Sequence, residues 1–155
     1  MKSSPYITAE GMARLNEELE ERWQRRRDVV KALSAAAAEG DRSENAEYIY
    51  RKKELRGIDR RIRYLQKRMP DLRVVSDKPH DQEVIFFAAR VTLETEAGDE
   101  VEYRIVGPDE IDHEKGNISL DSPLAQALLK KQVDDEVTIH IQQGRKTYAI
   151  IAVHY

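Results

Sequence analysis

The sequence contains no cysteine, which excludes disulfide bonds and thiolate metal ligands. It also lacks a signal-peptide core near its start and an apolar run of the roughly 20 residues that a membrane-spanning helix needs. Its four histidines do not have the spacing of a metal site, and no glycine-rich phosphate loop or nucleophile elbow is present. We therefore expect a cytoplasmic protein that has no membrane partner and no self-contained active site.

The charge of the chain is unevenly divided. The net charge of the 155 residues is −3. Residues 1–79 hold 19 Lys and Arg against 14 Asp and Glu, whereas residues 80–155 hold 7 against 15. This asymmetry predicts two domains, 1–79 and 80–155, with different partners, and makes the basic domain a candidate for binding a polyanion.

Two long helical patterns fill the first domain. Proline is absent from residues 8–38, where apolar residues recur in steps of three and four and Thr8 can cap the helix start. A second, more regular apolar seam runs through residues 45–69 and stops at a proline. Since only the short stretch 39–44 joins them, the helices must run antiparallel, as a coiled-coil finger whose tip is that stretch.

The apolar seam of the first helix is interrupted in its middle. The positions that would continue it between Leu19 and Val29 are Arg22 and Arg26. Arginine cannot fill an apolar layer without a partner for its charge. We therefore expect this part of the finger either to pack imperfectly or to bind something.

The second domain shows the shorter period of strands. Segments rich in β-branched and aromatic residues predict strands within 83–95 and at 101–106, 136–141 and 148–153. Ser122 followed by Pro123 predicts the capped start of a short helix. The expected fold class is α+β, with an N-terminal helical hairpin and a C-terminal antiparallel sheet that carries one short helix.

The expected tip carries two carboxylates, Asp41 and Glu44. Their spacing is that of a capping box, and Ser43 is another possible cap for the second helix, so a structural role is one reading. In the other reading, the two carboxylates hold a hard cation such as Mg²⁺. Because two carboxylates bind Mg²⁺ weakly, that ion would be shared with a partner. The residues alone leave both readings open, and one carboxylate could also serve both roles.

A basic run follows on the second helix. Residues 51–68 hold nine Lys and Arg against two acids, an excess that favours contacts with phosphates over a merely solvated face. Arg56, Arg60, Arg63 and Lys67 repeat at helical spacing, and we expect them beside the apolar seam. The candidate RNA-binding residues are Arg51, Lys52, Lys53, Arg56, Arg60, Arg61, Arg63 and Lys67.

Three segments resemble the GreA/GreB family of bacterial transcript cleavage factors, and the density of basic residues is more similar to the GreB type. They are the tip 40–48, the run 104–107 and the segment 118–131, which contains Asp121-Ser122-Pro123. The resemblance covers essentially the whole chain. It implies an FKBP-like C-terminal domain that docks on RNA polymerase through Asp121, Ser122 and Pro123, and a finger that enters the polymerase secondary channel.

The resemblance also implies a role for the tip. Asp41 and Glu44 would hold an Mg²⁺ of the polymerase active site and stimulate cleavage of backtracked nascent RNA, whose 3′ segment the basic face would guide. The protein would then be a monomeric elongation factor and no enzyme by itself. Two rival hypotheses are a channel regulator without cleavage activity and a free-standing RNA-binding hairpin.

Overall fold

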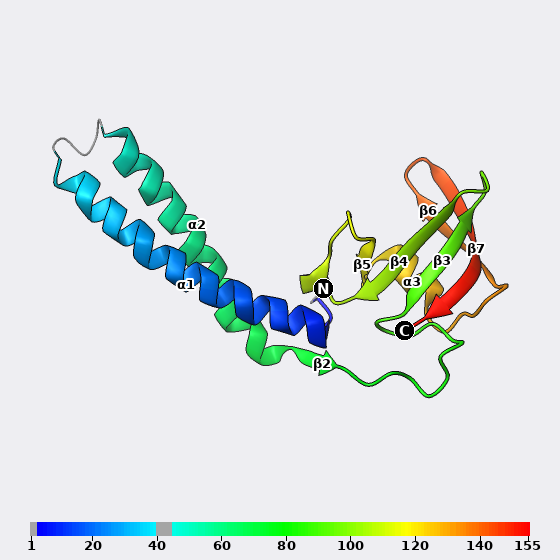
Figure 1. Ribbon diagram of the computed structural model, residues 1–155. Helices are drawn as coiled ribbons and strands as arrows, with labels where there is room; N and C mark the ends of the chain where they lie inside the picture. The colour runs from blue at the N-terminus through cyan, green and yellow to red at the C-terminus, as the bar shows by residue number, and fades with distance from the viewer. Residues whose placement is uncertain (1–2, 40–44) are drawn as a thin grey trace. The chain divides into compact units, whose positions relative to one another are not determined.

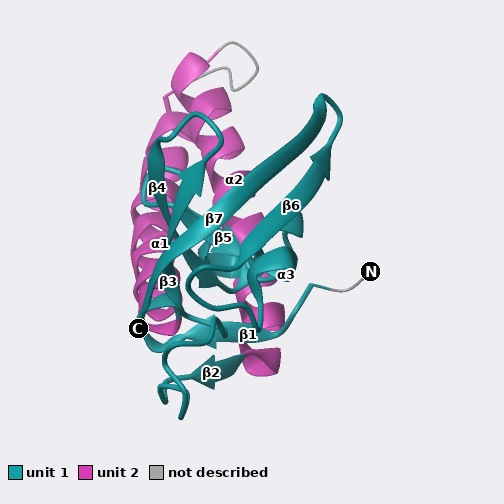
Figure 2. Ribbon diagram, turned by 90° about the vertical axis from the view of Figure 1, so that its right-hand side faces the viewer, with its two compact units in different colours: residues 1–11, 73–155 teal, residues 12–72 magenta. Residues whose placement is uncertain are grey.

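The computed structural model describes residues 3–39 and 45–155, which form two compact units (Figures 1 and 2). One unit is residues 12–72, and the other joins the N-terminal residues up to Gly11 with Arg73–Tyr155. The predicted division was at residues 79 and 80. The short N-terminal strand and the segment from Arg73 therefore belong to the compact unit that contains the large sheet.

The first domain forms the two long helices that the sequence predicts. Helix α1 spans Ala9–Ala37 and helix α2 spans Ala46–Arg68, and they run side by side in opposite directions (Figure 1). Thr8 caps α1, because its Oγ1 accepts a hydrogen bond of 3.0 Å from Gly11 N. No helix of the described ranges, 3–39 and 45–155, is long and apolar enough to cross a membrane.

The interrupted seam between the helices is completed by ion pairs. Val29, Ile58 and Ile62 form a buried cluster. At the two polar positions, Arg22 Nε donates to Glu18 at 2.6 Å and Arg26 Nε donates to Asp59 at 2.6 Å. In the middle of the hairpin, charge-assisted hydrogen bonds therefore take the place of apolar contacts. The apolar packing is interrupted there, as the sequence indicates.

A curled five-stranded sheet forms the centre of the other unit (Figure 1). Its order is β5-β4-β3-β7-β6, and helix α3 spans Pro123–Leu128. The strands are β3 (Arg90–Thr95), β4 (Glu100–Val106), β5 (Asn117–Ser119), β6 (Glu136–Ile141) and β7 (Gly144–His154). Residues of the sheet and of α3 share one buried core, which includes Val91, Ile105 and Leu128. The α+β class is confirmed.

Two details of the predicted sheet are corrected. The sheet is mixed, because β5 pairs parallel to β4 after the short 3-10 helix η2 (Pro108–Glu110) and a turn return the chain to the same edge. The apolar run 84–87 is also not a regular strand. There the Tyr155 hydroxyl accepts from Phe86 N and donates to Val84 O, both at 2.7 Å, so a side chain replaces part of a strand ladder.

A second, two-stranded sheet was not predicted. β1 (Tyr6–Thr8) pairs parallel with β2 (Arg73–Val75), which follows the 3-10 helix η1 (Met69–Asp71) at the end of α2. Three residues are too few to show a strand period in the sequence. This pairing brings the segment before α1 and the segment after α2 together. The two ends of the helical hairpin therefore continue into two adjacent strands of the other compact unit.

Candidate functional site

The two tip carboxylates, Asp41 and Glu44, lie outside the described residues, as does Ser43. What the structure describes is the pair of helix ends from which the segment 40–44 extends. Helix α1 ends at Ala37, and helix α2 begins at Ala46.

Asn45 is the N-cap of α2. Its backbone is extended, with φ −83° and ψ 104°, and its side chain accepts a hydrogen bond of 3.2 Å from Tyr48 N. This overturns the alternative in which Asp41 or Ser43 caps the second helix, because the capping position is already filled. Sequence reasoning missed Asn45, although Asn ranks among the best N-cap residues and its position just before the helix was the available signal.

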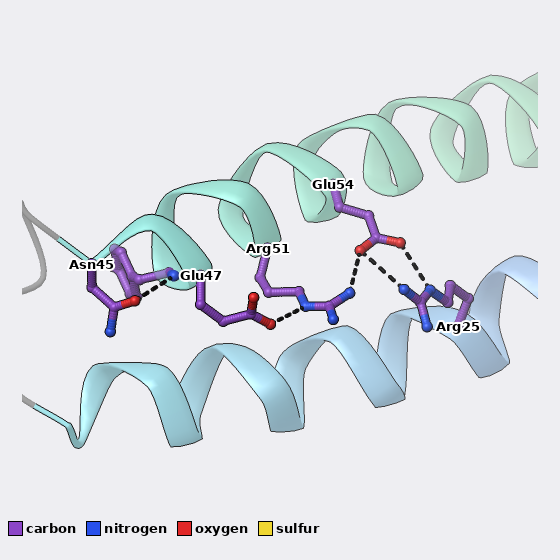
Figure 3. A network of polar contacts seen from close by, with 6 residues as sticks. Arg25, Asn45, Glu47, Arg51 and Glu54 are labelled. Carbon is purple, nitrogen blue, oxygen red and sulfur yellow. Dashed lines mark hydrogen bonds and ion pairs between the residues drawn. The ribbon is translucent and has the colours of Figure 1, made fainter.

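A chain of charged side chains joins the helices below the tip (Figure 3). Arg51 donates to Glu47 at 2.8 Å and to Glu54 at 3.0 Å. Glu54 also accepts two hydrogen bonds from Arg25 of α1, at 2.8 and 3.1 Å. The hydrogen bonds from Arg25, supported by the one from Arg51, lower the pKa of Glu54. Through the bonds between Arg25 and Glu54, this network joins α1 to α2 in the half of the hairpin nearer to the tip.

Two of the eight candidate RNA-binding residues, Arg51 and Arg61, are engaged in ion pairs. Arg51 is paired as above, and Arg61 donates to Glu18 of α1 at 2.8 and 2.9 Å. Arg61 therefore links α2 to α1, whereas Arg51 pairs with two carboxylates of its own helix. Both guanidinium groups are neutralised largely by partners within the protein. Lys52 lies 5.8 Å from the centre of the Tyr48 ring, and Lys53 is exposed.

The remaining four residues, Arg56, Arg60, Arg63 and Lys67, form what we term the outer basic face. All four are exposed, and none has an ion pair with any residue of 3–39 or 45–155. Each stands two positions from a buried seam residue, Ile58, Ile62 or Leu65. Two positions turn a helix by about 200°, so this face lies opposite the seam and not beside it, as the sequence analysis expected.

Two tyrosines of α2 are exposed on the same helix. Tyr50 is 60% exposed and Tyr64 is 44% exposed, so neither belongs to the buried seam of the hairpin. The guanidinium carbons of Arg51 and Arg61 lie 5.4 and 5.2 Å from their ring centres. Both rings are thus reachable from solvent, as a ring that stacks on a base must be, whereas Tyr48 is half-buried.

The expected docking residues lie where α3 begins. Ser122 Oγ accepts from Ala125 N at 3.2 Å, and Pro123 occupies the first turn, so the predicted helix start is confirmed. Asp121 is exposed, and its carboxylate accepts hydrogen bonds from Ser4 N, at 2.9 Å, and from Ser4 Oγ. The motif thus caps a helix and also holds the N-terminal segment.

A buried carboxylate, which sequence reasoning missed, fixes the start of α1. Glu110 is 7% exposed and accepts hydrogen bonds from Thr8 N at 3.0 Å, Gly107 N at 2.8 Å and Thr8 Oγ1. A Cβ at Gly11 would lie 2.0 Å from Glu110 Oε1. The glycine in the first turns of a long helix was the available signal, because only glycine leaves room for this carboxylate.

The arrangement offers no complete metal site within residues 3–39 and 45–155, where no three His, Asp or Glu residues gather to hold an ion. Carboxylate oxygens such as those of Asp41 and Glu44 are the type of ligand that Mg²⁺ prefers. Two residues cannot fill its octahedral coordination, so the ion would need further ligands. The described part of the hairpin therefore supplies a basic face, exposed rings and a capped end.

Known proteins match the chain along almost its whole length. The family model "Transcription elongation factor, N-terminal" matches residues 5–74, and "Transcription elongation factor, GreA/GreB, C-term" matches residues 79–155. Transcription elongation factor GreB of Xanthomonas axonopodis pv. citri is 58% identical over 99% of this chain and 93% of its own. The GreB of Pseudomonas aeruginosa is 52% identical over 98% of this chain and 91% of its own.

The solved structure of GreA factor homologue 1 of Thermus thermophilus is 26% identical over 97% of this chain and 98% of its own, with a TM-score of 0.43. The superposition is too loose to add to the assignment. The two family models and the GreB relatives establish it without that structure. The chain belongs to the GreA/GreB family of transcription elongation factors.

Proposed function

We propose that this protein enters the secondary channel of RNA polymerase and stimulates cleavage of backtracked nascent RNA. The observation that carries the proposal is the cap of α2. Because Asn45 fills the N-cap position, Asp41 and Glu44 are not needed to cap that helix. Two carboxylates beyond the capped end of a helical hairpin are then available to a partner's active site.

Asp41 and Glu44 would act as oxygen ligands to an Mg²⁺ ion shared with the polymerase. When bound, this ion would activate the attacking water or stabilise the leaving oxygen of the phosphodiester. The carboxylates of this chain would hold it and orient the water. The protein is therefore not proposed to be an enzyme by itself, since the remaining ligands must come from the polymerase.

The outer basic face would contact the extruded 3′ segment of the RNA. Its four residues have no acidic partners in the described ranges and lie along the helix that leads to the tip. Each cation that neutralises a phosphate releases counterions, so this contact should weaken as salt rises. Tyr50 and Tyr64 are exposed and would stack on unpaired bases.

The Asp121-Ser122-Pro123 motif would dock the protein on the polymerase. Its residues stand at the start of α3, where Asp121 and Pro123 are exposed. Docking through this unit would leave the hairpin free to enter the channel.

Halted polymerase complexes that contain backtracked RNA test the proposal. The wild-type protein should shorten the RNA from its 3′ end, and Asp41→Asn with Glu44→Gln should abolish cleavage without weakening polymerase binding. Persistent cleavage by that double variant would overturn the assignment of the tip. Binding without any cleavage by the wild-type protein would instead favour a channel regulator.

A further inference from the structure

We propose that Asn45 is a positioning residue that fixes the separation of the two helix ends and thereby places Asp41 and Glu44 for the cleavage step. This inference rests on the proposed function. Asn45 lies between the tip and α2 and makes one side-chain bond to each helix. Its role would be to join the helices, in addition to capping one of them.

The two bonds of Asn45 use the two different atoms of its amide. Oδ1 accepts from Tyr48 N at 3.2 Å in the first turn of α2. Nδ2 donates to Ala36 O at 2.8 Å in the last turn of α1. The opposite orientation of the amide would set a donor against Tyr48 N and an acceptor against Ala36 O, so only this orientation satisfies both helices.

Capping alone does not explain why the residue is asparagine. Serine, aspartate and asparagine cap helices about equally well, because each offers an oxygen to the backbone amides of the first turn. Of the three, aspartate has no donor and serine has a single hydroxyl oxygen, whereas asparagine offers one atom that accepts and a separate atom that donates. The bond to Ala36 is therefore the part of the contact that goes beyond capping.

The bond to Ala36 is the last bond between the helices before the tip, among those of the described residues. Further down the hairpin, Glu54 binds Arg25 and Glu18 binds Arg61. A loop explores fewer conformations when its ends are held at one distance. The bond between Ala36 and Asn45 thus fixes the distance that the intervening segment has to span.

The separation of the helix ends can be measured in the free protein. The chain has no cysteine, so in the double variant Ala35→Cys with Ile49→Cys a thiol-reactive spin label would attach at these two positions alone. Both positions are exposed. With Asn45 present we expect one narrow distance distribution, and with Asn45→Ser a broader one. Serine keeps the cap, so helix content by circular dichroism should stay unchanged, while Asn45→Ala should lower it.

The consequence for cleavage is a split between binding and turnover. Asn45→Ser should keep its affinity for polymerase within about twofold, and its cleavage rate at saturating protein should fall by about tenfold, since small misplacements of reacting groups are costly. The Mg²⁺ concentration for half-maximal cleavage should rise. A fraying helix alone would not raise it, and Asn45→Gln, which keeps an amide, should recover part of the rate.

The outcomes separate the two proposals. Normal cleavage by Asp41→Asn with Glu44→Gln would overturn the proposed function. If that variant is inactive but Asn45→Ser keeps the wild-type distance distribution or the wild-type cleavage rate, the role of Asn45 is overturned and the proposed function stands.

Discussion

Glu18 of α1 accepts two hydrogen bonds from the guanidinium of Arg61 on α2, at 2.8 and 2.9 Å. A third comes from Arg22, one turn along α1, at 2.6 Å. The bond from Arg61 is the main cause that lowers the pKa of Glu18 to about 2. A single carboxylate thus joins the helices and satisfies an arginine at an interrupted position of the seam.

This pKa predicts how the hairpin responds to acid. Because the folded pKa is depressed below the ordinary value of 4.5, the stabilisation is present above pH 4.5 and is lost as pH falls from 4.5 towards about 2. The Glu18 side chain is 25% exposed, so after solvent screening we expect a contribution of about 1 kcal/mol. Urea denaturation of wild type and Glu18→Gln across this window, followed by helix circular dichroism, measures it.

The matched control for this titration is Glu17→Gln. Glu17 is exposed on α1 and has no ion pair with the residues that the structure describes. We expect Glu18→Gln to flatten the loss of stability between pH 4.5 and 2, and Glu17→Gln to leave it unchanged. Equal slopes for wild type and Glu18→Gln would contradict the assigned link between the helices.

Two glycines in helices should respond in opposite ways to alanine. A Cβ at Gly11 would lie 2.0 Å from Glu110 Oε1, and moving that buried carboxylate would break its bonds to Thr8 and Gly107. We expect Gly11→Ala to destabilise the protein by about 2 kcal/mol. At Gly57 a Cβ would meet nothing within 4 Å, so Gly57→Ala should stabilise α2 by about 0.5–1 kcal/mol.

Thermal unfolding of both alanine variants tests this pair. The same chemical change is made in each, so the sign of the shift reports the surroundings alone. If Gly11→Ala were as stable as wild type, Glu110 would not be the clamp that the geometry indicates.

The elements that could be predicted are those with a long period or a strong local signal. The helices were predictable because their seams repeat over many turns, and the start of α3 because Ser122 and Pro123 are both typical of a first turn. The run 84–87 was assigned to a strand on composition, and the Tyr155 hydroxyl, about 70 residues away in sequence, decided otherwise. Propensity carries no information about such a distant partner.

The candidate site was predictable in composition but not in its internal pairing. Nine basic residues in one run gave the charge of α2, and the structure was needed to show that Arg51 and Arg61 are engaged in ion pairs. The cap was missed for a related reason. Asp41, Ser43 and Asn45 all suit an N-cap, and which of them caps depends on where the helix begins.

Neutralising the outer basic face should weaken action on RNA without unfolding the hairpin. We expect Arg56→Ala, Arg60→Ala and Arg63→Ala together to reduce cleavage of long backtracked RNA by about tenfold or more, and of short RNA much less, because only a long 3′ segment reaches the face. The dependence of the rate on salt should also become shallower. Cleavage assays on RNAs of graded length measure both effects.

A variant of equal charge change controls for general electrostatics. Lys115, Arg145 and Lys146 are exposed in the other compact unit, and their replacement by alanine removes the same three charges. This control should cleave long RNA as the wild type does. Equal losses for long and short RNA in the variant of the outer basic face would count against a guiding role.

The contact between Asp121 and Ser4 allows docking to be separated from folding. Ser4→Ala removes the hydroxyl that binds Asp121 but leaves the carboxylate in place. If Asp121 contacts the polymerase directly, Asp121→Ala should lower affinity by about tenfold, which is about 1.4 kcal/mol, and Ser4→Ala should change it less than twofold. Equilibrium binding of labelled variants to core polymerase measures both. An equal loss in the two variants would mean that Asp121 acts by holding the N-terminal segment, since only that contact is common to both.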